Sequence, residues 1–222
     1  MRRRIRCLLL PVAVLLLSGT GCVTGKVLYL PGDLYRPTAG MPAAPPEGPE
    51  VAVLDFSYAG TPPYEIGRDF DHARSIVWES EPGKVLADLV AGVLEEQGIS
   101  ALRVSSESDV PPAAVAKVWG RVDELRVSSK KTGSLRLTVE VSASVAATLF
   151  ASGGAAPPGW SSSLSSDFLS TEPLFVSPAA VQAAVSGAAN AVAEEAVKRL
   201  FASGAVHRPD APQDASGGGS RR

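Results

Sequence analysis

Residues 135–150 read LRLTVEVSASVAATLF and carry the most regular pattern in the chain. Every second position from Leu135 to Leu149 is apolar, and the positions between them are polar apart from Ala146 and Phe150. Alternation of this kind is typical of a β-strand with one buried face and one solvated face. These residues therefore predict a long strand that covers a hydrophobic core on one side only.

The segments on either side predict two further strands, of which residues 117–127 would pair with this strand in an antiparallel hairpin. Residues 117–127 alternate in the same way, but the pattern slips by one at Asp123 and Glu124, which indicates a β-bulge. Residues 130–133 (KKTG) would form the turn between the two strands, and residues 160–169 alternate again as a third strand. The expected unit is an antiparallel hairpin, which residues 153–159 connect to the third strand.

Two segments have helical periodicity. Residues 82–97 place apolar side chains on one stripe, and Gly98 follows where a C-terminal glycine is expected. The second helix begins after Ser177, with Pro178 at its first position, and ends before Gly204. Its many alanines would let its backbone approach a sheet closely.

Two further strands are expected at residues 51–56 (VAVLDF) and 99–104, where short apolar runs lie between polar segments. The order β-α-β-β-β-β-α predicts an α/β (α+β) fold. We expect a two-layer sandwich, in which two amphipathic helices cover one face of a mixed, mostly antiparallel sheet. Residues 26–30 (KVLYL) and 76–78 could add short strands, or could belong to a linker and a loop respectively.

Residues 1–21 have the composition of a secretory signal peptide. Four arginines within the first six residues precede an apolar run at residues 7–17, and the small residues SGTG follow. This run is too short to cross a bilayer, which takes about 20 apolar residues. We therefore expect the chain to be exported and residues 1–21 to be removed.

Cys22 follows this segment directly. Thr20, Gly21 and Cys22 resemble the cleavage box of bacterial lipoprotein precursors, although Gly19 stands where an apolar residue is usual. The resemblance implies a membrane anchor of acyl chains, such as palmitate, on Cys22. Val23, in place of an aspartate, favours the outer membrane. The alternative is a soluble exported protein with one free thiol, because Cys7 leaves with the signal peptide.

Composition divides the remaining chain into three parts. Residues 22–50 contain six prolines and suggest a tether, residues 51–203 a globular domain, and residues 204–222 a disordered tail. The formal net charge of −2 gives no indication of a nucleic-acid partner. The two cysteines predict neither a zinc site nor a disulfide framework.

Motifs for catalysis are not found in the sequence. It lacks G-x-S-x-G and a P-loop, and of its two histidines His207 lies in the expected tail. A Ser-His-Asp triad would therefore have to use His72. We expect no catalytic residue, no cofactor and no metal, and a protein that is not an enzyme.

One long loop, at residues 57–81, gathers polar and aromatic side chains that a partner protein could bind, namely Arg68, Asp69, Asp71, His72 and Trp78. Two other interpretations stay open, a cation site on the three residues Asp69, Asp71 and His72, and a solvated loop with no function. Trp119 is expected on the less apolar face of the sheet, where it could contact a partner or pack beneath a loop.

The signal segment, Cys22, VAVLDF at residues 51–56 and the order of elements together resemble the YajG-like bacterial lipoproteins. More loosely they resemble the auxiliary lipoproteins of ABC-type envelope transport systems. The resemblance implies a non-enzymatic module that binds envelope proteins or lipid from a membrane anchor at the periplasmic face. The alternatives are a structural subunit of a homo-oligomeric envelope complex and a periplasmic hydrolase that uses the His72 loop.

Overall fold

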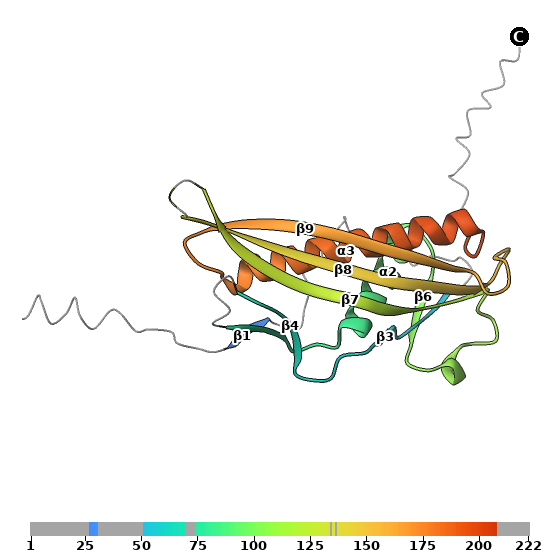
Figure 1. Cartoon of the computed structure of the whole chain (residues 1–222). Coiled ribbons are helices and arrows are strands. Elements are labelled where there is room, and N and C mark those ends of the chain that lie inside the picture. The colour runs from blue at the N-terminus through green and yellow to red at the C-terminus, as the bar shows by residue number, and fades with distance from the viewer. Residues whose placement is uncertain (1–26, 31–50, 70–73, 134, 136, 208–222) are drawn as a thin grey trace, which may run out of the picture.

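The structure is a computed structural model that describes residues 27–30, 51–69, 74–133, 135 and 137–207. It has two layers, a nine-stranded sheet and two helices (Figure 1). In chain order the elements are β1 (Val27–Leu30), β2 (Val51–Leu54), β3 (Ser57–Tyr58), β4 (Tyr64–Arg68), β5 (Ser75–Trp78), α2 (Pro82–Glu96), β6 (Ala101–Val104), the 3₁₀ turn η1 (Glu107–Asp109), β7 (Ala116–Thr132), β8 (Thr138–Gly153), β9 (Ser161–Pro173) and α3 (Pro178–Ser203).

The long strands β7, β8 and β9 form an antiparallel meander, which contains the predicted hairpin of β7 and β8. The other edge of β7 pairs in succession with the short strands β2, β3 and β4, all of them parallel to it. β6 extends the sheet beside β2, and β5 and β1 extend it beside β4. Most of the paired residues lie in the antiparallel meander, which confirms the mixed, mostly antiparallel sheet.

Both helices cover the same face of this sheet, as the sequence predicts. α3 runs along β8 and β9, and α2 packs beside it against β2, β6 and β7 (Figure 1). The apolar positions of β8, from Val139 to Ala151, are all at most 3% exposed beneath the helices. Alanines at the α3 contact keep the two layers close because they add little volume.

The predicted helix ends are present. The Ser177 hydroxyl accepts a hydrogen bond from the Ala180 amide at 3.0 Å, which satisfies one of the free donors of the first turn of α3. Gly204 and Gly98 have φ angles of 74° and 80° just after the helices, a conformation that side chains with a Cβ rarely adopt. The sheet carries its bulge where the alternation slips, between Val122 and Glu124.

The structure differs from the expected boundaries in two places. β1 lies before residue 51, the expected start of the domain, so the alternative of a docked strand at residues 26–30 is correct. Three strands, β3, β4 and β5, also occupy the segment expected to be one long loop. They are short and carry several polar residues, and strands of this kind have no clear alternation.

The β7–β8 turn also lies further along the chain than expected. β7 continues to Thr132 and β8 begins at Thr138, so Leu135 and Leu137 belong to the connection and not to the buried face. They are 75% and 51% exposed, because the connection extends past the part of the sheet that α3 covers (Figure 1). The sequence expectation that both are buried is wrong.

Candidate functional site

The structure separates the residues predicted to form a partner surface. The Trp78 side chain is buried in the core and the Asp69 carboxylate is buried beside Arg74, whereas Arg68 is exposed and pairs with Glu65 at 3.0 Å. Asp71 and His72 lie outside the described residues, as does Cys22. Of the three described residues, only Arg68 presents its side chain to solvent, and the function of this segment stays a prediction.

Asp69 and Arg74 bind each other across the two ends of the connection between β4 and β5. The Arg74 Nε donates to Asp69 Oδ2 at 2.7 Å, and the Asp69 amide donates to the Arg74 carbonyl at 3.1 Å. Arg74 Nη2 also reaches the Val176 carbonyl at 3.2 Å, just before α3. A buried carboxylate is stable only when it is paired, so the pair holds the connection against the start of α3.

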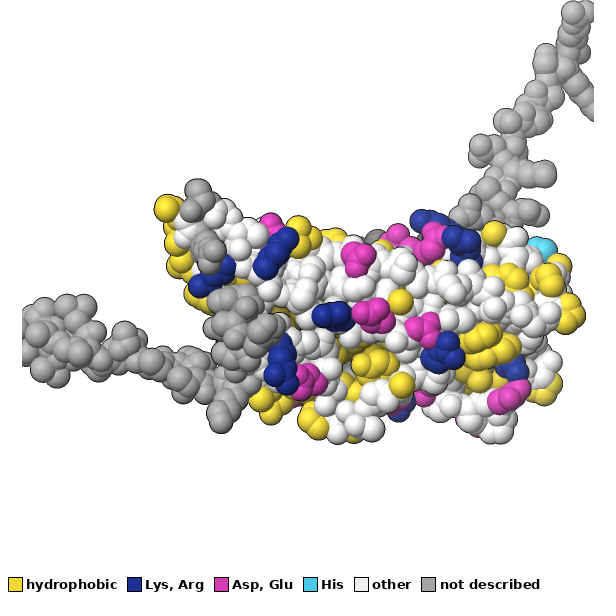
Figure 2. All heavy atoms as spheres, in the orientation of Figure 1, with side chains coloured by type: hydrophobic (Ala, Val, Ile, Leu, Met, Phe, Trp, Pro, Cys, Tyr) yellow, Lys and Arg dark blue, Asp and Glu magenta, His cyan; other side chains and the backbone are white. Residues whose placement is uncertain are grey.

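The open face of the meander, away from the helices, is the broadest exposed surface of the sheet. It carries mostly uncharged polar side chains and a few charged pairs (Figure 2). Serine hydroxyls of neighbouring strands meet at 2.8 Å between Ser128 and Ser142, and Lys130 pairs with Glu140 at 2.9 Å. The hydrogen bond from Lys130 lowers the pKa of the Glu140 carboxyl.

The β-bulge places a carboxylate on this open face. Asp123 is the extra residue of the bulge, and its carboxylate accepts hydrogen bonds from Arg121 at 2.5 Å and from Thr148 at 2.6 Å. Burial raises the pKa of the Asp123 carboxyl, but the two hydrogen bonds outweigh this effect, so its pKa lies below the ordinary value. The bulge is thus held by a cross-strand polar contact.

Trp119 lies on the open face, as predicted, and is half-buried there. Its ring stacks on Phe150 of the paired strand, with ring centroids 5.7 Å apart, and Lys117 Nζ lies 4.9 Å from the Trp119 ring centroid. Lys117 also pairs with Glu107 of η1, and the hydrogen bond in this pair lowers the pKa of the Glu107 carboxyl. An aromatic pair of this kind is a surface that a partner protein could bind.

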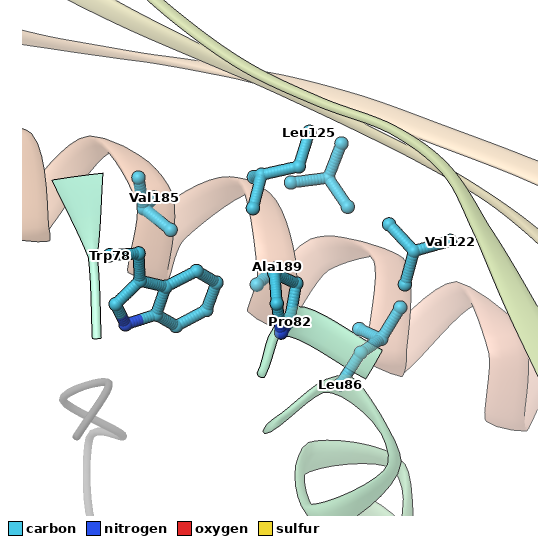
Figure 3. Close-up of a pocket in the computed structure, with 8 residues that line it drawn as sticks. Trp78, Pro82, Leu86, Val122, Leu125, Val185 and Ala189 are labelled. Atoms are coloured by element: carbon cyan, nitrogen blue, oxygen red, sulfur yellow. The ribbon is translucent and has the colours of Figure 1, made fainter. Parts of the chain in front are cut away.

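A small apolar cavity lies between the two layers, beneath the bulge (Figure 3). It encloses about 10 Å³, roughly the space of one water molecule, so no acyl chain fits in this conformation. The indole nitrogen of Trp78 is buried without a hydrogen-bond partner and lies on the side of its ring away from Ala189 (Figure 3). The residues that line the cavity are Trp78, Pro82, Leu86, Val122, Leu125, Val145, Val185 and Ala189.

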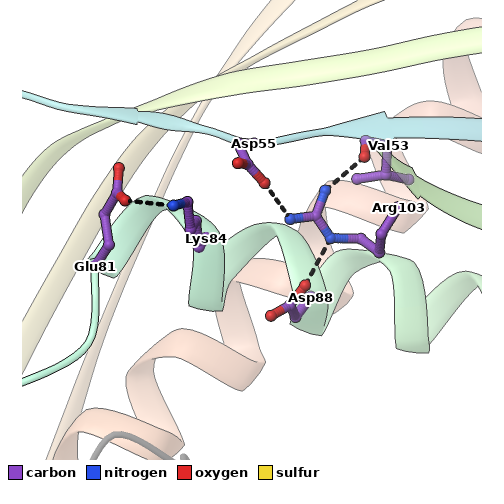
Figure 4. Close-up of polar contacts among 6 residues, drawn as sticks. All are labelled: Val53, Asp55, Glu81, Lys84, Asp88 and Arg103. Carbon is purple, nitrogen blue, oxygen red and sulfur yellow. Dashed lines mark hydrogen bonds and ion pairs between the residues drawn. The ribbon is translucent and has the colours of Figure 1, made fainter. Parts of the chain in front are cut away.

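A polar cluster joins α2 to the edge strand β6 and to its neighbour β2 (Figure 4). Arg103 donates to Asp88 and Asp55 at 2.6 Å each, and to the Val53 carbonyl at 2.5 Å. Nearby, the hydrogen bond to Glu81 raises the pKa of Lys84. Because Arg103 bonds to Asp88 of α2, to Asp55 and to the Val53 carbonyl at once, we interpret the cluster as a structural clamp on α2.

Two observations bear on chemistry at these sites. Within the described ranges, no group of three His, Cys, Asp or Glu side chains is placed to hold a metal ion. The cation site considered for Asp69, Asp71 and His72 depends on residues outside those ranges and stays untested. Neither helix in the described part of the chain is both long and apolar enough to cross a membrane.

Comparison with solved structures finds a similar fold in a protein of known structure. A Xanthomonas campestris protein of the family DUF330 is similar with a TM-score of 0.50 and 16% identity, over 80% of this chain and 96% of its own. The PelC dodecamer from Paraburkholderia phytofirmans gives a TM-score of 0.39 with 18% identity, over 73% and 95% of the two chains. Rare lipoprotein B from Shewanella oneidensis gives 0.35 with 13% identity, over 62% and 92%.

The class that these observations define is the two-layer α+β sandwich. No protein-family model and no curated protein sequence matches the chain. At 16% identity the likeness to the DUF330 protein shows the fold alone, so membership of the YajG-like family stays a prediction.

Proposed function

We propose that this protein is a lipid-anchored lipoprotein of the bacterial cell envelope that binds other envelope components without catalysing a reaction. The observation that carries the proposal is the position of Cys22. It directly follows a secretory signal segment, and residues 22–26 are all that separates this segment from β1. Acyl chains on Cys22 would hold the folded domain close to the membrane, and two or more chains anchor a protein stably.

The partner is proposed to be an envelope protein or a lipid-transport component, bound at the open face of the meander. This face offers the stacked pair Trp119 and Phe150, together with cross-strand hydroxyls that can exchange hydrogen bonds with a partner. The outer membrane is the proposed location, because Val23 stands where an aspartate would favour retention at the inner membrane.

Intact mass spectrometry tests the anchor. The protein is extracted with detergent from the membranes of its own host, alongside the variants Cys22→Ser and Cys7→Ser. We expect the chain beginning at Cys22 to be heavier by two or three acyl groups, and Cys7→Ser to behave as the unaltered protein. A bare chain mass, or an unchanged membrane fraction for Cys22→Ser, would contradict the proposal.

A second candidate function is that of a structural subunit in a homo-oligomer. It is favoured by β9, whose residues Ser161–Pro173 pair with β8 on one side and with no other described strand. Light scattering on the detergent-extracted protein tests this. Self-association should weaken in a Ser163→Lys/Ser165→Lys variant, since lysine on an edge strand disfavours pairing with another strand. A monomer at every concentration would exclude the candidate.

A further inference from the structure

Four large apolar side chains are exposed together at one end of the molecule. Leu135 and Leu137 lie in the β7–β8 connection, and Leu174 and Phe175 lie between β9 and α3. They are 75%, 51%, 55% and 62% exposed in that order. We call these four residues the hairpin-end cluster. Figure 2 shows hydrophobic side chains along this end of the molecule.

The two segments of the cluster are held side by side. The Leu174 amide donates to the Leu137 carbonyl at 2.8 Å, and Thr138 pairs with both Thr132 and Pro173 in the adjoining ladder. Leu137 and Leu174 are therefore neighbours along the backbone, next to the end of the ladder that joins β7, β8 and β9.

Leu174 is an unusual residue for its backbone conformation. Its φ angle is 69°, the one positive φ among non-glycine residues in the described ranges. Glycine or asparagine normally occupies such a position, since a Cβ there is strained. At Leu174 the backbone is strained and the apolar side chain is exposed. Neither a preference for this conformation nor burial in the core therefore explains why a leucine stands at this position.

The pairing of the sheet places this cluster on the side from which the chain enters the domain. Val27 pairs with Ser75, Ser75 with Arg68, and Arg68 with Ser128, so β1 begins level with Ser128 of β7. β1 runs antiparallel to β7, and its first residue, Val27, therefore lies at the end of β1 that points towards the hairpin side.

The reach of residues 22–26 is comparable to the distance by which β7 extends beyond the start of β1. From Ser128 to Thr132, β7 extends about 13 Å towards the hairpin end. An extended segment of residues 22–26 reaches at most about 17 Å from Val27. If Cys22 carries the anchor, as the proposed function holds, the membrane surface lies within reach of the hairpin end.

The charges near the cluster fit a membrane with anionic lipids. The sequence from Lys130 to Leu137 reads KKTGSLRL and contains three basic residues and no acidic residue. Lys130 is paired with Glu140 on the open face but is 71% exposed. Apolar side chains beside basic ones are the composition that binds the interface of an anionic bilayer.

We propose that the hairpin-end cluster inserts into the headgroup region of the membrane that carries the anchor, and that anionic phospholipid is its ligand. This inference rests on the proposed function for the anchor, but it adds a second, non-covalent contact. It also orients the domain, with the long strands pointing their hairpin end at the bilayer and the opposite end, at Val115, away from it.

A chemical tether allows the membrane contact to be tested independently of the natural anchor. The chain from Cys22 onward contains a single cysteine, which can be coupled to a maleimide lipid in vesicles that contain brominated phospholipid. The variants Leu135→Trp and Val115→Trp, at opposite ends of β7, are compared with the unaltered protein. We expect bromine to quench the added emission of Leu135→Trp and to leave that of Val115→Trp unchanged.

A second measurement removes the tether altogether. The Cys22→Ser chain is floated with vesicles of phosphatidylglycerol and phosphatidylethanolamine, and with vesicles of phosphatidylcholine alone. Binding to the anionic vesicles should be stronger, and Leu135→Asn/Phe175→Asn should weaken it about tenfold or more, since each side chain loses its apolar contact. Val115→Asn, which removes an exposed apolar residue elsewhere, should bind as the parent chain does.

The possible outcomes are distinct. Equal quenching at positions 135 and 115 overturns the membrane contact. Loss of self-association in the double variant, with vesicle binding unchanged, also overturns it and makes the cluster a contact between copies of the chain. A bare mass for the natural protein, with quenching at position 135 intact, contradicts the proposed anchor and leaves the membrane contact supported.

Discussion

Gly187 of α3 faces the ring of Phe168 in β9 so closely that a Cβ at Gly187 would lie 2.3 Å from Phe168 Cγ. Phe168 lies on the helix-covered side of β9, because it pairs with the buried Ala143. The missing side chain of Gly187 is what lets an aromatic ring fit between the edge strand and the helix.

Gly187→Ala should lower the free energy of unfolding by about 1 kcal/mol. Overpacking costs about 1–3 kcal/mol, and the gain from replacing glycine within a helix offsets about 1 kcal/mol of that. In a Phe168→Ala background the sign should reverse, because the added methyl group then meets no ring. Urea unfolding of the four proteins in this cycle checks both values, and equal effects in the two backgrounds would contradict the contact.

The buried pair of Asp69 and Arg74 should be far more costly to break than the exposed pair next to it. Arg74→Gln removes the guanidinium that pairs with the Asp69 carboxylate, which is 4% exposed. We expect a loss of about 3 kcal/mol, within the range for breaking a buried pair. Arg68→Gln, which removes the exposed pair with Glu65, is the matched control and should cost less than about 1 kcal/mol. Chemical denaturation measures the free energy of unfolding of both variants. Similar losses for Arg74→Gln and Arg68→Gln would contradict this prediction.

Asp123 should contribute stability that depends on pH. Its pKa is lowered in the folded state, so the contribution is complete above the ordinary value of 3.8 and is lost as the pH falls through the lowered pKa. The difference in urea midpoint between the unaltered protein and Asp123→Asn should therefore shrink below pH 3.8. A difference that stays constant on acidification would show that the charge of Asp123 is not involved.

Leu174→Gly should stabilise the domain, because glycine adopts a φ of 69° without strain. The gain is expected to be about 1 kcal/mol, the cost of a left-handed conformation for a residue with a Cβ. Leu137→Gly, at a neighbouring exposed position without positive φ, is the control and should not stabilise. A destabilised Leu174→Gly variant would mean that the leucine makes contacts that the fold needs.

The sequence predicted the elements whose side chains alternate or recur over many residues. The three long strands, both helices, the bulge at Asp123 and the cap at Ser177 all have such local signals. The short strands do not, since β4 depends on Gly67, where a Cβ would lie 2.0 Å from the Val127 carbonyl oxygen of β7. A close approach of this kind involves residues far apart in the sequence, and alternation does not reveal it.

The exposed sites were harder to predict for a related reason. Leu135 and Leu137 continue the alternation of β8 and look buried, but burial depends on where α3 begins and not on their own strand. Likewise Asp69 appears in the sequence as one charge of a polar loop. Its burial follows from the positions of Arg74 and Val176, which only the folded chain brings to it.

β7 is shared by two sets of strands, with β8 along one edge and β2, β3 and β4 along the other. Each of its central amides donates to a strand on one edge or the other, so exchange along the whole of β7 requires both sets to separate, and such opening approaches global unfolding. Amide exchange should be slowest near Val118 and Val122 and much faster along the outer edge of β9. The domain is for the same reason a single cooperative unit that cannot be divided into two independently folding halves.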